Sequence, residues 1–328
     1  MRGHHDLGGL NEGPLDIRED DLKLYERRAD AMVILLVGRG FYTLDASRRV
    51  AEIDLSADEY DSIRYYDRWL VQARRLMTEL DVISEAEVER EIVVARDQLT
   101  AEHESADSVL TDAAVGAAHP HDHDVAADTD ASDSPPGEYE ILEAALRTLF
   151  LSKGLLTATE LQAEGAAMES RTPELGTRLV AHAWSDPKIF DLAIYDAIAA
   201  AAAIGLDMSN AVPVRAVANT PDVHHLVVCT LCSCYPRPLL GPPPTWYKSR
   251  AYHAKAVIAP RGILREFGTE LPASTEIRAV DSTADLRYLV IPRRPAGTDD
   301  WSADKLEKLV TRDSMIGVGL ATEPATIA

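Results

Sequence analysis

All three cysteines of this 328-residue chain lie within one run of six residues, Cys229-Thr-Leu-Cys232-Ser-Cys234. A reduced cysteine usually packs as a small apolar side chain anywhere in a core, so confinement to one C-x-x-C-x-C run indicates chemistry. Cys232 and Cys234 are too close for a relaxed disulfide, and any pairing leaves one thiol over. The spacing predicts a tight loop in which three thiols converge on a soft or borderline transition metal. A redox or purely structural role is the alternative.

The charge and the hydropathy of the chain exclude several classes of partner. The chain carries 54 acidic and 33 basic residues, a formal charge of -21, which argues against a nucleic acid or an anionic membrane. No apolar run reaches the roughly 18 residues that cross a bilayer. The N-terminal residues lack the apolar segment of a signal peptide. We therefore expect a cytoplasmic protein, in a compartment that keeps thiols reduced before metal loading.

A change in composition divides the chain into two modules. Residues 105–137 are rich in Asp, Ala, His and Pro, which predicts a flexible acidic linker. Its three close histidines, His119, His121 and His123, are alternatively a site for a divalent metal. We expect an α+β protein with a helical module over 1–104, the linker over 105–137, and a mixed α/β module over 138–328 that carries the cysteine loop.

Capping signals and periodicity place the elements of both modules. Residues 22–36 have helical periodicity, and the boxes at Ser56-Ala-Asp-Glu59 and Ser84-Glu-Ala-Glu87 predict two further helix starts. The helix from Ser56 is expected to continue through Leu70. The glycine-rich residues 3–9 predict an extended arm. The second module is expected to contain strands at 212–217, 225–228, 276–280 and 287–291, with helices at 138–152, 158–170, 174–184, 188–204 and from 302.

The run Val228–Tyr235 resembles the metal-binding loop of nitrile hydratase alpha subunits and thiocyanate hydrolase gamma subunits, and the likeness extends over about 138–321. It implies cobalt(III) held by three cysteine sulfurs and the backbone amides of Ser233 and Cys234. Cys232 would be a sulfinic acid, Cys234 a sulfenic acid and Cys229 an unmodified thiolate. Thr230 and Tyr235 resemble the cobalt form, whereas the alternative iron(III) form usually carries Ser and Thr there.

The first 100 residues resemble the N-terminal half of the nitrile hydratase beta subunit, which we equate with the alpha subunit of thiocyanate hydrolase. The likeness implies that Arg48 donates to the oxidised sulfurs, a charge-assisted contact; a match at Arg49 or a helix-surface role is the alternative. Tyr65 and Trp69 match aromatic positions near the family's pocket, with Trp69 where relatives carry Tyr. Packing of an amphipathic helix is the alternative for both rings.

The resemblance implies addition of water across a carbon–nitrogen triple bond, with the sulfenate oxygen of Cys234 as base or nucleophile. Arg237 follows Cys234-Tyr235-Pro236, where typical nitrile hydratases have Trp. Since a guanidinium favours an anion, the sequence predicts hydrolysis of thiocyanate to carbonyl sulfide and ammonia. Hydration of a nitrile to an amide is the alternative, and a salt bridge is the structural alternative for Arg237.

The same resemblance implies partners for the chain. It lacks a counterpart of the C-terminal half of the beta subunit, so a separate small subunit is expected to complete a hetero-oligomer. A cobalt-loading activator is a further expected partner. We therefore interpret the chain as a natural or engineered fusion of beta-type and alpha-type modules. The non-enzymatic alternative is a maturation protein that carries cobalt.

Overall fold

The computed structural model describes residues 3, 5–19, 21–115, 135–208, 211–231 and 233–326. The chain packs as two compact units. The helical unit comprises Leu22–Gly165, and the mixed unit comprises Met1–Asp21 together with Ala166–Ala328. Helices and strands are both present, which confirms the α+β prediction. The three linker histidines lie outside the described residues.

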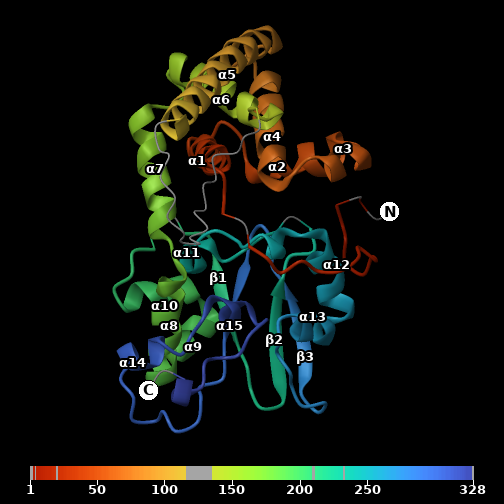
Figure 1. Cartoon of the computed structure of the whole chain (residues 1–328). Helices are drawn as coiled ribbons and strands as arrows, with labels where there is room; N and C mark the ends of the chain where they lie inside the picture. The colour runs from red at the N-terminus through yellow and green to blue at the C-terminus, as the bar shows by residue number, and fades with distance from the viewer. Residues whose placement is uncertain are drawn as a thin grey trace. The chain divides into compact units, whose positions relative to one another are not determined.

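Among the described residues, the helical unit contains the helices labelled α1 to α7 in Figure 1 and a short π-helix, η1. These elements are α1 (Leu24–Gly38), α2 (Leu44–Arg49), η1 (Val50–Asp54), α3 (Ala57–Ser62), α4 (Tyr65–Glu79), α5 (Glu85–Val115), α6 (Glu138–Ser152) and α7 (Ala158–Ser170), the last of which continues into the mixed unit. Buried side chains of α1, α4 and α6 form its core.

Two of the predicted helix starts in this unit are confirmed by their caps. Ser56 accepts from the backbone of Glu59 at 3.3 Å, and the Glu59 carboxylate accepts from the Ser56 backbone at 2.8 Å. Ser84 and Glu87 make the same pair of bonds. Each such cap stabilises the helix start because it satisfies N–H groups that have no partner within the helix.

The single helix that we predicted from Ser56 through Leu70 is wrong, because the structure has two helices there. Ile63 is extended, with φ -93° and ψ 126°, and separates α3 from α4. A side chain stabilises the break: Arg68 donates to the carbonyl oxygens of Tyr60 and Ile63, at 3.0 Å each. The guanidinium thereby satisfies carbonyl groups that the end of α3 leaves without helical partners.

The described residues of the mixed unit form four strands, all of which lie at the predicted places. They are β1 (Val214–Ala218), β2 (Val223–Val228), β3 (Glu276–Asp281) and β4 (Arg287–Ile291). The helices of the unit are α8 (Pro173–Ser185), α9 (Pro187–Tyr195), α10 (Ala197–Ala203), α11 (Arg237–Leu240), η2 (Trp246–Lys248), α12 (Arg250–Ile258), α13 (Pro260–Glu266), α14 (Ala303–Glu307), α15 (Arg312–Ile316) and η3 (Pro324–Thr326).

The strands form two parallel pairs that position the cysteine run. β1 pairs with β4, and β2 pairs with β3 in a register that sets Val228 opposite Asp281. Helices α9 and α10 pack against β1, whereas α12 packs against β2 and α13 against β3 (Figure 1). The cysteine run therefore begins at the carboxyl end of a strand whose last three residues are almost fully buried.

The helix that we predicted over 188–204 is interrupted at Asp196. This residue is extended, with φ -152° and ψ 97°, and its carboxylate accepts from the backbone of Ala199 at 2.9 Å. Asp196 thus ends α9 and caps α10. Aspartate competes for backbone donors in this way because its short side chain reaches the free N–H groups of a helix start.

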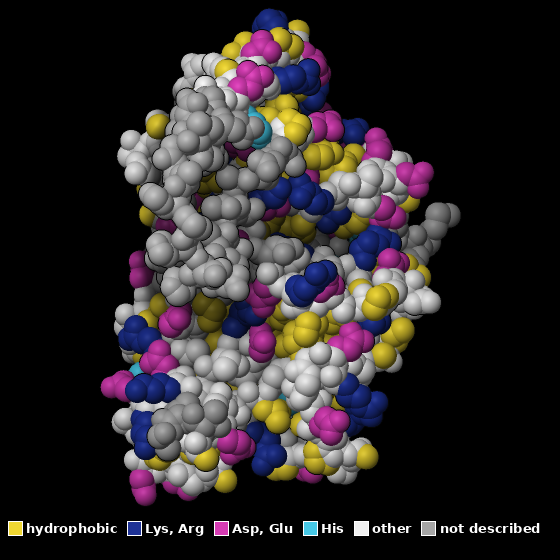
Figure 2. Space-filling view, in the orientation of Figure 1, with side chains coloured by type: hydrophobic (Ala, Val, Ile, Leu, Met, Phe, Trp, Pro, Cys, Tyr) yellow, Lys and Arg dark blue, Asp and Glu magenta, His cyan; other side chains and the backbone are white. Residues whose placement is uncertain are grey.

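The surface carries charges of both signs. On the face that Figure 2 shows, Lys and Arg side chains are interspersed with Asp and Glu. Exposed ion pairs such as Arg278–Glu276, at 2.8 Å, contribute little to stability because solvent screens both charges. Among the described residues, no helix is long and apolar enough to cross a membrane.

Candidate metal centre

The cysteine loop connects β2 to α11 in the mixed unit. Cys229 is 1% exposed and follows directly after β2, whereas Cys234 is half-buried. Cys232 lies outside the described residues. Among the residues that are described, no group of three His, Cys, Asp or Glu side chains is placed to hold a metal, so the set of three sulfurs stays a prediction.

Ser233 gives the loop its sharp turn. Its φ of 65° is in the left-handed region, and the residue is 4% exposed. A residue with a side chain adopts this conformation at a cost of about 1–3 kcal/mol and keeps it only where its surroundings determine it. The backbone of the turn, which includes the predicted amide ligands of Ser233 and Cys234, is therefore fixed by contacts outside the loop.

One of these contacts comes from the end of β3. The Asp281 carboxylate accepts from the Thr230 backbone N–H at 3.0 Å and from its hydroxyl at 2.6 Å. Burial raises the pKa of Asp281, the two bonds from Thr230 oppose that shift, and the nearby thiol of Cys229 adds to it. Asp281 anchors the first half of the loop, and no motif in the sequence singles it out.

A second set of contacts comes from η2 and α12. The Tyr247 hydroxyl donates to the carbonyl oxygen of Cys234 at 2.8 Å. His253 Nε2 lies 3.0 Å from Ser233 Oγ and 2.9 Å from the carbonyl oxygen of Tyr247. Burial raises the pKa of Tyr247 well above its usual range, and the thiols of Cys229 and Cys234 add to the shift. Both thiols therefore lie near one phenol.

The N-terminal arm lies along the loop and α12, as part of the same unit. The backbone N–H of Leu7 donates to the carbonyl oxygen of Thr230 at 3.4 Å, and the N–H of Gly9 donates to the carbonyl oxygen of Ala254 at 2.9 Å. Further along the arm, Glu12 accepts from Arg250 at 2.8 and 3.1 Å. The described residues of the arm form no helix or strand, but they include turns, in which the N–H of Asp6 donates to the Gly3 carbonyl oxygen at 3.1 Å and that of Leu10 to Leu7 at 3.0 Å. The arm is therefore irregular rather than extended throughout.

The described donor groups fit a soft or borderline transition metal. A buried thiol, a half-buried thiol and a turn of fixed backbone come together at one end of β2. Thiolates are the ligands that such metals prefer, and their deprotonation is favoured when a cation binds. Cys229, Cys234 and the Ser233 amide would hold the metal together with the predicted Cys232.

Three predicted site residues belong to the helical unit, so their place at the loop stays a prediction. Arg48 lies on α2, where its Nε donates to Glu52 at 3.0 Å. Arg49 forms ion pairs with Asp54 and Glu79. The rings of Tyr65 and Trp69 on α4 have centroids 5.2 Å apart. Trp69 also packs against the helical core, as the packing alternative expects.

Arg237 is the first residue of α11 and is half-buried. Its backbone N–H donates to the carbonyl oxygen of Tyr235 at 2.8 Å, and its carbonyl accepts from Gly241 at 3.0 Å. These bonds close a compact turn directly after the loop. The backbone is thus fixed three residues after Cys234, whereas the place of the Arg237 guanidinium in a substrate site stays a prediction.

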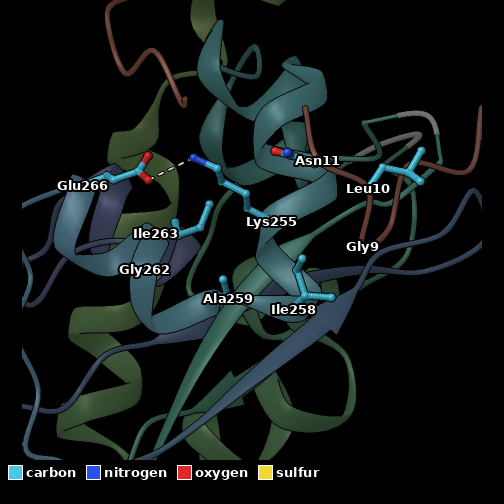
Figure 3. A pocket seen from close by; sticks show the side chains of 9 residues that line it. All are labelled: Gly9, Leu10, Asn11, Lys255, Ile258, Ala259, Gly262, Ile263 and Glu266. Carbon is cyan, nitrogen blue, oxygen red and sulfur yellow. Dashed lines mark hydrogen bonds and ion pairs between the residues drawn. The ribbon is translucent and has the colours of Figure 1, made fainter. Parts of the chain in front are cut away.

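The mixed unit also has a pocket of about 300 Å³ beside α12 and α13. Its lining is mainly apolar, with Leu10 from the arm and Ile258 from α12 (Figure 3). Lys255 Nζ lies 3.1 Å from a Glu266 carboxylate oxygen on the next helix. The charge of Lys255 is therefore paired with a carboxylate on α13, and this side chain lines the pocket. The buried His253 on the same helix contacts the cysteine loop instead.

The described part of the cysteine loop places Cys229 and Cys234 directly after a buried parallel strand, where the sequence predicts that they ligate a metal. The family profile described as "Nitrile hydratase, alpha chain" matches residues 137–319, and "Nitrile hydratase beta subunit, N-terminal" matches residues 1–118. The chain therefore belongs to the nitrile hydratase family, which confirms the resemblance. Its homologues are subunits of nitrile hydratase and thiocyanate hydrolase enzymes, and they are named as separate chains.

Two relatives show what the mixed unit is similar to. It is 46% identical over 192 residues to the high-molecular weight cobalt-containing nitrile hydratase subunit alpha of Rhodococcus rhodochrous, a match that covers 58% of this chain and 95% of that subunit. A recombinant thiocyanate hydrolase with partially modified cobalt centres is 41% identical, with a TM-score of 0.55 over 57% of this chain and 92% of that one.

One prediction about the N-terminal half needs a correction, namely which thiocyanate hydrolase subunit this half matches. Thiocyanate hydrolase subunit beta of Thiobacillus thioparus is 28% identical to this chain over 95 residues, a match to 29% of this chain and 60% of that subunit. We equated this half with the alpha subunit of thiocyanate hydrolase, and the matching subunit is beta. Subunit letters do not follow from residues, so no feature of the sequence could have decided between them.

Proposed function

We propose that this chain is the catalytic part of a cobalt(III) enzyme that hydrates a C≡N bond, with thiocyanate as the substrate and carbonyl sulfide and ammonia as products. Support for the metal comes from the cysteine loop and from two relatives whose names include cobalt. The chemistry that bound cobalt(III) supplies is Lewis-acid activation. Hydration of a nitrile to an amide is the second candidate, because the 46% identical relative is a nitrile hydratase.

The proposal of thiocyanate rather than a nitrile rests on the residue at position 237. Arg237 directly follows the loop on a turn of fixed backbone. A guanidinium near the loop attracts an anion such as thiocyanate and makes the site less suitable for a neutral apolar nitrile. The local cation matters more in this chain than in a neutral one, because a net charge of -21 repels anions at longer range.

The remaining site residues receive roles that the relatives suggest. Oxidised Cys232 and Cys234 would carry negatively charged sulfur oxygens, and Arg48 would donate hydrogen bonds to them. Tyr65 and Trp69 would form an aromatic wall for the substrate. A separate subunit equivalent to the C-terminal half of the beta subunit would complete the hetero-oligomer, and an activator would load the cobalt.

The experiment is an assay of the purified chain, with any subunit that copurifies, on thiocyanate and on a small aliphatic nitrile. We expect carbonyl sulfide and ammonia from thiocyanate, and a lower kcat/KM for the nitrile. A higher kcat/KM for the nitrile would make nitrile hydration the favoured function and thiocyanate hydrolysis the second candidate. Cobalt that leaves readily to a chelator, without turnover of either compound, would favour the cobalt carrier instead.

A further inference from the structure

The left-handed turn at Ser233 is held by a residue that the proposed function does not use. His253 lies on α12, twenty residues after Ser233, and is 4% exposed. Its Nε2 is within hydrogen-bond distance of the Ser233 hydroxyl and of the Tyr247 carbonyl oxygen, at 3.0 and 2.9 Å. A side chain buried to this extent, with two contacts at one ring nitrogen, has a fixed orientation.

The chemistry of the two partners assigns the hydrogen on the ring. A carbonyl oxygen only accepts hydrogen bonds, so His253 Nε2 must carry a hydrogen and donate it. The Ser233 oxygen lies at nearly the same distance and shares this donor. The imidazole therefore links the turn of the cysteine loop to the backbone of η2 through one N–H group.

Tyr247 makes η2 a firm support for that link. Its side chain is fully buried, and its ring lies 4.9 Å from the Tyr235 ring and 5.4 Å from the Tyr252 ring. Its hydroxyl donates to the Cys234 carbonyl oxygen at 2.8 Å. Two consecutive residues of the loop, Ser233 and Cys234, are thus tied to one residue of η2, the first through His253 and the second directly.

We propose that His253 is a positioning residue of the metal loop, which holds Ser233 in its left-handed turn before the metal binds. The backbone of the loop is then ordered before the metal arrives, so metal binding loses less conformational entropy. This inference rests on the proposed function, which makes the backbone of Ser233 and Cys234 part of the metal site. The role requires an N–H donor at the position of Nε2.

The test compares the full chain with two variants, His253→Gln and His253→Leu, all purified without cobalt. Glutamine places an amide N–H near the position of Nε2, whereas leucine has no donor. Amide hydrogen exchange of residues 229–236 reports the order of the loop without metal. Cobalt bound per chain at limiting cobalt, and the absorption spectrum of the bound cobalt, report how the loop holds it.

We expect His253→Leu to exchange loop amides roughly two- to tenfold faster and to bind cobalt more weakly by a similar factor, as the loss of one buried hydrogen bond implies. His253→Gln should keep both the amide exchange rate and the cobalt affinity close to those of the wild type. Lys255→Met, on the same helix but paired with Glu266 (Figure 3), is the matched control and should behave as the wild type.

Ser233→Ala tests the same bond from the other side and keeps the imidazole, so it remains informative if His253→Leu does not fold. It should exchange loop amides faster, as His253→Leu does. The proposal is overturned if Ser233→Ala and the folded His253 variants match the wild type in exchange, cobalt affinity and spectrum. A wild-type chain that binds no cobalt would instead refute the proposed function, while the exchange comparison would still decide the role of His253.

Discussion

Replacement of Arg48 by lysine is expected to lower kcat on either substrate by on the order of 10²–10³, while the chain keeps its cobalt. Lysine retains the positive charge but lacks the planar fork that can bind two sulfur oxygens at once. In the structure the fork is oriented by the π-helix that follows α2, since Arg48 Nε donates to Glu52 Oε1 on η1 at 3.0 Å. Steady-state kinetics and cobalt analysis of the same preparation measure both parts of this prediction.

Arg49→Lys is the matched comparison, because Arg49 is the neighbouring arginine of the same helix. Its guanidinium pairs with Asp54 and Glu79, and we expect the substitution to cost about 1 kcal/mol of stability or less, with turnover retained. If Arg49→Lys were the inactive variant and Arg48→Lys the active one, the role would belong to Arg49. Near-normal rates in both variants would assign the contact to the partner subunit.

Replacement of Arg237 by tryptophan is expected to exchange the substrate preference. The loss of a charge-assisted contact to thiocyanate costs roughly 1.5–3 kcal/mol, which corresponds to about ten- to a hundredfold in kcat/KM. The indole should at the same time favour small neutral nitriles, since it replaces a cation by an apolar surface. The measurement is kcat/KM for both substrates, in the wild type and in the variant.

Arg237→Lys separates charge from shape at this position. It should keep most of the preference for thiocyanate, since a cation remains beside the loop. Arg237 is half-buried at the start of the four-residue helix α11, so the melting temperature of each variant must be compared before the rates. A tryptophan variant with the wild-type preference would show that Arg237 serves only the turn or a salt bridge, and it would remove the main reason to place thiocyanate first.

Local signals predicted much of the fold. The helix expected over 138–152 is α6 (Glu138–Ser152), and the capping boxes at Ser56 and Ser84 begin α3 and α5. The predictions were wrong where a single residue breaks a continuous periodicity. Asp196 ends one helix and caps the next. The break at Ile63 is stabilised by Arg68, a contact that periodicity does not reveal.

The candidate site divides in the same way between local and distant contacts. The cysteine spacing alone predicted the loop, because all of its chemistry lies within six residues. The groups that hold the loop are far away along the chain. Asp281 is 51 residues from Thr230, and His253 is 20 residues from Ser233. Their contacts depend on the pairing of β2 with β3 and on the packing of α12, which no motif in the sequence encodes.

We propose that the loop from Cys229 to Cys234 holds one cobalt(III), with Cys229 as a thiolate and with Cys232 and Cys234 oxidised. Metal analysis of the chain expressed with cobalt and iron both supplied, combined with mass spectrometry of the peptide that contains the loop, tests it most directly. We expect one cobalt per chain, with a sulfinic acid at Cys232 and a sulfenic acid at Cys234. Stoichiometric zinc with three unmodified thiols would contradict it.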